Sequence, residues 1–250
     1  MNLKQYQTDA LNVLRSFLEA ARTTGPKNAY DAITKTPEQL KRIGRYRTQY
    51  EALEALPDVP YVCLRLPTGG GKTILGAHAI AVARDAWIDK DYPLVLWLVP
   101  SNTIRSQTVE ALKNTRHPYR QALDEQFGGR VRVFDVADFT TIRPQDIKDT
   151  ACVIVGTIQT LRADKTEGRK VYAHNEDMEP HFTSVPKSFT GLEQLETGGP
   201  KFSFANLLHV LRPLMIVDEA HNAVTGLSRE MQARVNPLSL IHISEPTRRT

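Results

Sequence analysis

The stretch Leu66-Pro-Thr-Gly-Gly-Gly-Lys-Thr73 decides the fold of this chain. An apolar run at 61–66 predicts a buried strand that leads into it, and a helical pattern begins just after the glycines. Gly69, Gly70 and Gly71 allow a tight turn in which successive backbone N–H groups point toward one anion. The start of the helix adds the positive end of its dipole. Strand, loop and helix together predict a site for the phosphates of a nucleotide.

The residues at the end of this stretch supply the groups that a triphosphate and its Mg²⁺ require. Lys72 is expected to reach the β- and γ-phosphates, and the Thr73 hydroxyl to coordinate Mg²⁺. Thr68 belongs to the same phosphate-binding loop. Leu66 stands where the strict pattern G-x-x-x-x-G-K-[ST] has its first glycine. A glycine-rich turn without a ligand is the alternative, and the strand before and helix after the loop argue against it.

A second stretch, Met215-Ile-Val-Asp-Glu-Ala-His221, places two acidic residues after another apolar run. The run at 214–217 predicts a buried strand that carries Asp218 to the edge of a sheet. Asp218 is expected to hold Mg²⁺ through water, and Glu219 to position and deprotonate the attacking water. The two stretches therefore predict the two halves of one site for ATP and Mg²⁺.

Apolar runs alternate with helical patterns from residue 61 onward, which is typical of a parallel sheet with helical crossovers. The expected fold is α/β, with a mostly parallel sheet flanked by helices. The predicted strands cover 61–66, 94–99, 131–136, 151–155 and 214–217, and the predicted helices cover 3–21, 72–87 and 103–113.

Two polar segments interrupt a domain that we expect to span 1–237. The first insertion, at about 22–60, is predicted to be partly helical and holds a basic run at 41–47. The second, at about 162–205, is rich in turn residues and predicts a surface excursion or arm.

The final segment, 238–250, is predicted not to belong to the natural protein. Leu238-Ser-Leu-Ile-His-Ile-Ser-Glu-Pro-Thr-Arg248 resembles the translation of an adaptor used in transposase-based sequencing libraries. The prediction is that the natural sequence stops near Pro237 and that the lobe is truncated, with an ordinary basic tail as the alternative. Loss of a strand beside the nucleotide site is then expected to leave an exposed sheet edge.

Composition is that of a soluble globular protein, with 41% hydrophobic and 24% charged residues. A net charge of +4 suits a nucleic-acid partner without establishing one. No signal peptide or membrane-spanning run is recognised, so a cytoplasmic location is expected. Cys63 and Cys152 lie in apolar runs, which predicts two reduced core cysteines rather than a zinc site.

The variant Pro-Thr-Gly-Gly-Gly-Lys-Thr at 67–73, with Asp-Glu-Ala-His at 218–221, resembles the first RecA-like lobe of a superfamily 2 helicase. More narrowly, the chain is similar to the ATPase subunit of type III restriction enzymes and related DEAD/DEAH-box proteins. The resemblance runs from Leu3 to about Pro237. It implies a RecA-like P-loop NTPase lobe that, in an intact protein, hydrolyses ATP to move on DNA.

The resemblance also assigns roles to residues that are weak signals alone. Tyr6-Gln7 resembles the adenine-reading element of the family, which implies that the Gln7 amide contacts the base. His221 would couple the nucleotide state to a second lobe.

Two further motifs resemble family elements that touch a nucleic-acid backbone. Val99-Pro-Ser-Asn102 follows the second predicted strand, and Val155-Gly-Thr-Ile-Gln-Thr-Leu161 ends the fourth. The resemblance implies backbone contacts from Pro100, Ser101 and Thr157. Helix capping is the alternative for both hydroxyls.

The chain departs from the family pattern after His221. The expected Ser/Thr-Ala-Thr-type element, the second RecA-like lobe and its arginine finger are not recognised, and neither is a nuclease motif. Binding of ATP and Mg²⁺ with little turnover is therefore expected of these residues. In type III systems a separate methyltransferase subunit reads the DNA sequence, so such a subunit is a possible partner by resemblance.

Two other functions remain open from the sequence. The same motifs fit the lobe of an RNA helicase. They also fit a nucleotide-gated interaction module without enzymatic activity, which would use the basic run at 41–47. That run is otherwise read as a solvated helix face.

Overall fold

The computed structural model describes residues 3–39, 49–162, 166–186, 189–218 and 229–245. Within these ranges six strands form one sheet in the order β1-β6-β5-β2-β4-β3, and every neighbouring pair is parallel. The strands are β1 (Tyr61–Arg65), β2 (Leu94–Val99), β3 (Val131–Asp135), β4 (Ala151–Thr157), β5 (Leu214–Asp218) and β6 (Ser239–Ser244). The five predicted strands are confirmed as β1 to β5. Because all strands run the same way, their carboxyl ends meet at one edge of the sheet.

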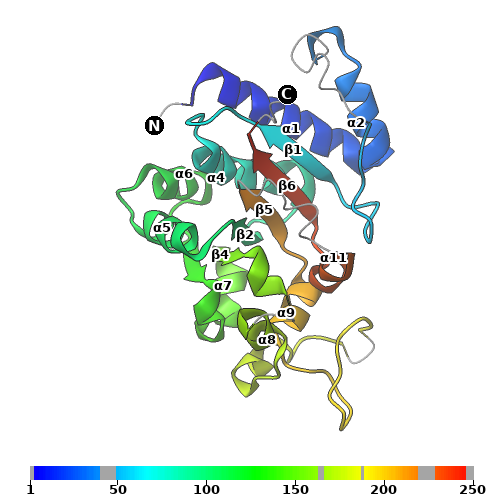
Figure 1. Cartoon of the computed structure of the whole chain (residues 1–250), viewed down its shortest axis with the longest axis vertical. Helices are drawn as coiled ribbons and strands as arrows, with labels where there is room; N and C mark the ends of the chain where they lie inside the picture. The colour runs from blue at the N-terminus through cyan, green and yellow to red at the C-terminus, as the bar shows by residue number, and fades with distance from the viewer. Residues whose placement is uncertain (1–2, 40–48, 163–165, 187–188, 219–228, 246–250) are drawn as a thin grey trace.

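The sheet is covered by helices on both faces, as its fully buried strands β2, β4 and β5 require. One face carries the helices α1 (Gln5–Thr24), α4 (Lys72–Ala83), α5 (Asn102–Lys113) and α6 (Pro118–Phe127), with α2 (Pro26–Thr34) against α1. The other face carries η3 (Val136–Thr141), α7 (Pro144–Asp149), η4 (Ile158–Leu161), α8 (Thr166–Tyr172), η5 (Glu176–His181), α9 (Phe204–Leu211) and α11 (Arg229–Val235). Figure 1 shows α1 and α2 toward one end of the molecule and α8 and α9 toward the other. The predicted α/β fold is confirmed.

The helix after the glycine-rich loop differs from its prediction in one respect. It is α-helical over Lys72–Ala83 and continues as a π-helical turn, η2 (Arg84–Ile88). The helical segment thus ends close to the predicted residue 87. Its last turn, however, has π-helical rather than α-helical hydrogen bonds. Almost every residue of α4 is buried, because the helix lies between the sheet and the helices α1 and α6.

The strand β6 was not predicted, and it fills the place where an exposed edge was expected. It lies between β1 and β5 and pairs with both. Leu240, Ile241 and Ile243 are buried, so this run satisfies the need of a central parallel strand for apolar residues on both faces. The geometry does not test the origin of 238–250, and the adaptor origin stays a prediction.

The second polar segment is only partly the surface excursion that the sequence predicts. Val171, Tyr172, Met178 and Phe182 are buried in the core beneath the sheet. The residues from 189 to 201 do lie outside this core, and in Figure 1 the loop before α9 extends away from the body. The buried residues were not recognised from the sequence, because charged residues separate them along the segment.

Asn206 of α9 anchors the base of this loop. Its Oδ1 accepts from the backbone N of Glu193, and its Nδ2 donates to the carbonyls of Glu193 and Lys201. In the first segment, α2 confirms the partly helical prediction, whereas the basic run at 41–47 lies outside the described residues.

The prediction of two core cysteines is right for Cys152 and wrong for Cys63. Cys63 is exposed because β1 is an edge strand, and its Sγ lies 3.3 Å from the Ser244 Oγ. Both thiols are free. Among the described helices none has the length and apolar character needed to cross a lipid bilayer.

Candidate nucleotide site

The glycine-rich loop connects β1 to α4 at the carboxyl edge of the sheet. Gly69 and Gly71 have φ of 69° and 74°, values that favour glycine. A Cβ at Gly70 would lie 2.7 Å from the carbonyl oxygen of Pro67, to which the Gly70 N–H donates at 2.8 Å. All three glycines are therefore required by the path of the backbone, as the sequence predicted for a phosphate-binding turn. Thr68 is exposed at the start of this turn.

Lys72 turns its ammonium group toward an anion. Its side chain is 6% exposed, and its Nζ lies 2.8 Å from a carboxylate oxygen of Glu245, just after β6. The environment of Lys72 thus fits an anionic ligand, which is the role that the sequence predicts.

Thr73 and Asp218 lie together although they are 145 positions apart. The Thr73 Oγ1 donates to the Asp218 Oδ2 at 3.3 Å, and Asp218 is 5% exposed at the end of β5. A hydroxyl and a carboxylate are oxygen donors of the kind that Mg²⁺ takes, and Mg²⁺ usually completes its shell with water and phosphate oxygens. No group of three or more His, Cys, Asp and Glu side chains that could hold a metal exists among the described residues. Because Mg²⁺ usually keeps water and phosphate oxygens in its shell, one hydroxyl and one carboxylate suit an ion that is held jointly with a nucleotide.

Gln7 lies beneath the loop rather than beside it. Its side chain is 4% exposed, its Nε2 donates to the Gly70 carbonyl at 2.8 Å, and its Oε1 accepts from the Lys4 backbone N at 2.8 Å. The Tyr6 hydroxyl donates to the same Gly70 carbonyl at 3.0 Å. Both polar atoms of the Gln7 amide thus bond to the protein in this structure, and the contact with adenine stays a prediction.

The structure brings together Gln7, the glycines, Lys72, Thr73 and Asp218 from β1, β5, α1 and α4. Glu219 and His221, the predicted base and coupling residue, lie outside the described residues.

The predicted nucleic-acid contacts lie farther along the same edge. Pro100 and Ser101 follow β2, whose last residue Val99 pairs with Thr157 at the end of β4. The exposed Ser101 caps α5, and its Oγ accepts from the Ile104 N. Thr157 is 2% exposed and its hydroxyl lies 3.2 Å from that of Thr160. Ser101 thus caps its helix and is exposed, whereas Thr157 is buried beside a neighbouring hydroxyl, and the nucleic-acid contacts stay a prediction.

One ion pair at this edge was missed in the sequence. Arg105, in the first turn of α5, lies with its Nε 3.3 Å from the Asp135 Oδ1 at the end of β3. Both side chains are mostly buried, with 14% and 18% exposed. The sequence could have indicated this pair, because the carboxyl ends of parallel strands and the starts of the helices that follow them lie at one edge of the sheet.

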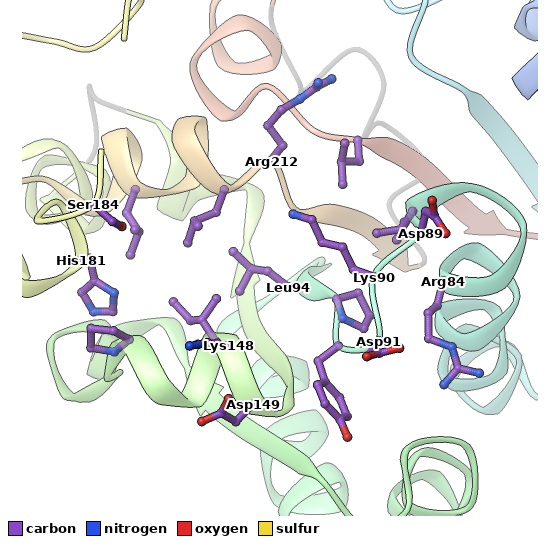
Figure 2. Close-up of a pocket in the computed structure, with 18 of the residues that line it drawn as sticks. Arg84, Asp89, Lys90, Asp91, Leu94, Lys148, Asp149, His181, Ser184 and Arg212 are labelled. Carbon is purple, nitrogen blue, oxygen red and sulfur yellow. The ribbon is translucent and has the colours of Figure 1, made fainter. Parts of the chain in front are cut away.

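A cavity lies at the opposite, amino-terminal edge of the sheet. Figure 2 shows it between the turn before β2, α7, the end of η5 and the end of α9. Its rim mixes cations and anions, among them Lys90, Asp91, Lys148 and Asp149. None of the predicted site residues lines it.

Similarity searches relate the chain to restriction and helicase proteins. Residues 1–243 match the family described as "Type III restriction enzyme, res subunit". A search of curated proteins found no match.

Two solved structures are similar to the chain, each at 14% identity. The UvsW helicase from bacteriophage T4 aligns over 86% of this chain and 63% of its own, with a TM-score of 0.35. A nuclease-deletion mutant of the type ISP restriction-modification enzyme LlaGI, in complex with a DNA substrate mimic, aligns over 98% of this chain and 18% of its own, with a TM-score of 0.41. The chain thus spans less than two thirds of either protein.

The family match includes the glycine-rich loop, the Thr73–Asp218 contact and the strand β6 up to residue 243. The chain belongs to the family of type III restriction enzyme res subunits, and its fold is α/β, with one parallel sheet between two layers of helices.

Proposed function

We propose that the chain binds ATP and Mg²⁺ at the carboxyl edge of its sheet, as the ATP-binding lobe of a DNA-directed translocase of the type III restriction class. The observation that carries this proposal is the contact between Thr73 and Asp218, 3.3 Å apart, beside the glycine-rich loop. Two sequence segments meet there, and each of them predicts a Mg²⁺ ligand on its own. Membership of the res-subunit family supports ATP as the nucleotide.

In the proposed complex the backbone N–H groups of 69–71 bind phosphate oxygens, and Lys72 binds the terminal phosphates in place of the Glu245 carboxylate. Thr73 and Asp218 hold Mg²⁺ directly or through water. Glu219 is the proposed base, and His221 the proposed link to a second lobe.

DNA is proposed to cross the same edge, next to Pro100, Ser101 and Thr157. The exposed Ser101 hydroxyl and the start of α5 suit phosphate groups, which they contact without reading sequence. Of the three, Ser101 has the accessible hydroxyl. The methyltransferase subunit of a type III system is a proposed partner on the grounds of family alone.

A polypeptide of these 250 residues is proposed to hydrolyse ATP slowly. In the family that the chain resembles, the second lobe supplies an arginine that stabilises charge on the γ-phosphate. Such an arginine contributes roughly 10³-fold or more to the rate in related phosphoryl transfers.

The test is a titration of the purified chain with ATP by calorimetry, with and without Mg²⁺. We expect saturable binding that weakens when Mg²⁺ is removed, and that is lost in Lys72→Ala. Lys90→Ala is the matched control, because Lys90 is exposed at the opposite edge, and it should bind like the wild type. Equal binding by the wild type and Lys72→Ala would exclude the proposed site.

A second titration distinguishes DNA from RNA as the nucleic-acid partner. Labelled single-stranded DNA, duplex DNA and RNA of equal length are added to the ATP-bound chain at fixed salt, since such affinities depend on salt. Preference for DNA supports the proposal, preference for RNA supports an RNA helicase lobe, and ATP binding without nucleic-acid binding supports the interaction module.

A further inference from the structure

The carbonyl group of Gly70 is held by two side chains from the first turn of α1. The Tyr6 hydroxyl donates to it at 3.0 Å, and the Gln7 Nε2 donates to it at 2.8 Å. These residues lie more than 60 positions from the loop in sequence. A single backbone carbonyl with two side-chain donors is therefore fixed in direction by a separate element of the fold.

The direction of this carbonyl decides where the next N–H points. A trans peptide group is planar, with its C=O and N–H on opposite sides. Because the Gly70 carbonyl points toward α1, the N–H of Gly71 points away from α1, on the other side of the peptide plane. The left-handed φ of 74° at Gly71 then begins α4, whose first bond runs from the Leu75 N–H to the Gly71 carbonyl.

The two donors differ in how replaceable they are. Gln7 is buried, and a Cβ on Gly71 would lie 2.5 Å from its Nε2, so the amide fills the space beneath the loop. Its Oε1 is also engaged, by the Lys4 N–H. Tyr6 is 40% exposed, and phenylalanine has the same ring, so a Tyr6→Phe substitution removes the hydroxyl alone.

We propose that Tyr6 is a positioning residue of the nucleotide site, whose hydroxyl, together with the Gln7 amide, holds the Gly70 carbonyl and thereby aims the Gly71 N–H at the phosphates. This inference rests on the proposed binding of ATP at the loop. Neither side chain needs to touch the phosphates, since both act through the peptide group between Gly70 and Gly71.

The test is Tyr6→Phe, which removes one hydroxyl and one hydrogen bond. We expect ATP to bind roughly five-fold more weakly, the size of effect that follows from loss of one hydrogen bond. Tyr92→Phe is the matched control, because its hydroxyl also takes part in a hydrogen bond, from Arg130 at 3.2 Å, at the other edge of the sheet. ATP affinity in this control should equal that of the wild type.

Hydrogen exchange read by mass spectrometry supplies a readout that a general loss of stability would not imitate. In Tyr6→Phe we expect faster exchange confined to peptides that cover 66–75, with an unchanged denaturant midpoint. Gln7→Glu keeps the acceptor for Lys4 but replaces the donor to Gly70. Because both side chains act on one carbonyl, their effects on ATP affinity should not add.

Each outcome decides one of the two proposals. If the wild type binds ATP and Tyr6→Phe binds it equally well, the positioning role of Tyr6 is wrong and the nucleotide site stands. If exchange rises throughout the chain, Tyr6 supports the fold in general, and the positioning role is again wrong. If the wild type does not bind ATP, the proposed function itself is wrong.

Discussion

Gly76 allows α4 to lie directly on the sheet. A Cβ added at Gly76 would lie 2.8 Å from Cη2 and 2.9 Å from Cζ2 of Trp97, whose side chain is fully buried in β2. Contacts this short cannot be relieved by a flexible side chain, because the indole ring is rigid and enclosed. The position is inside the first turns of the helix that presents Lys72 and Thr73. Gly76, which has no side chain, thus allows the close approach of α4 to the sheet.

Gly76→Ala is expected to lower the free energy of unfolding by up to about 2 kcal/mol. Overpacking costs about 1–3 kcal/mol, and the better helix propensity of alanine offsets about 1 kcal/mol of this. The measurement is the urea midpoint. Gly156→Ala is the control, because its Cβ would have a nearest contact of 3.4 Å, to Val136. An equal loss in both variants would mean that the Trp97 contact is not the cause.

At the scale of elements, β6 determines whether the sheet is continuous. It joins β1, which carries the glycine-rich loop, to β5, which carries Asp218. Burial of Leu240, Ile241 and Ile243 contributes roughly 5–9 kcal/mol at about 1.5–3 kcal/mol for each side chain. The total stability of a domain is about 5–15 kcal/mol, so the strand is a large part of it.

A polypeptide of residues 1–237 is therefore expected to lose cooperative unfolding and to associate through the open edges of β1 and β5. The comparison is a polypeptide of residues 1–245, which keeps β6. Thermal unfolding by circular dichroism and size-exclusion chromatography give the readout. If 1–237 unfolds at the same temperature as 1–245, β6 is not a structural strand, and the predicted adaptor origin of 238–250 gains support.

At the scale of the whole molecule, two histidines link stability to pH. Burial lowers the pKa of His78, on α4, although Glu125 acts in the opposite direction. Burial also lowers the pKa of His181, whose Nε2 lies 2.9 Å from the Ile142 carbonyl. A histidine with a lowered pKa in the folded state binds protons more readily when the chain is unfolded. Its contribution to stability is present above the unfolded pKa of about 6.5 and is lost below it.

The free energy of unfolding is therefore expected to fall as the pH decreases from about 6.5 toward the lower folded-state pKa values. Urea unfolding between pH 7.5 and pH 5 measures this. The double variant His78→Gln and His181→Gln should show a flatter dependence over the same range, because neither glutamine titrates. An unchanged slope in the double variant would assign the dependence to other groups.

Much of the molecule could be predicted from local sequence. The strands β1 to β5 follow from apolar runs, since a run of that length between turns has few other stable placements. The loop at 66–73 follows from its glycines, and the edge shared by Asp218 and Thr73 follows from parallel strands. These predictions succeeded because each depends on neighbouring residues or on a general rule of strand direction.

Contacts between distant segments could not be predicted, because no local pattern encodes them. The sequence by itself determined that residues 61–73 and 214–218 form a strand with a glycine-rich loop and a strand ending in an acid. Only the tertiary structure decided that β6 lies between them, that Lys72 faces Glu245 and that Tyr6 and Gln7 hold the Gly70 carbonyl. It also decided that Thr157 turns its hydroxyl inward. The physical reason is that propensity and periodicity act along the chain, whereas strand order and side-chain partners depend on the whole packed core.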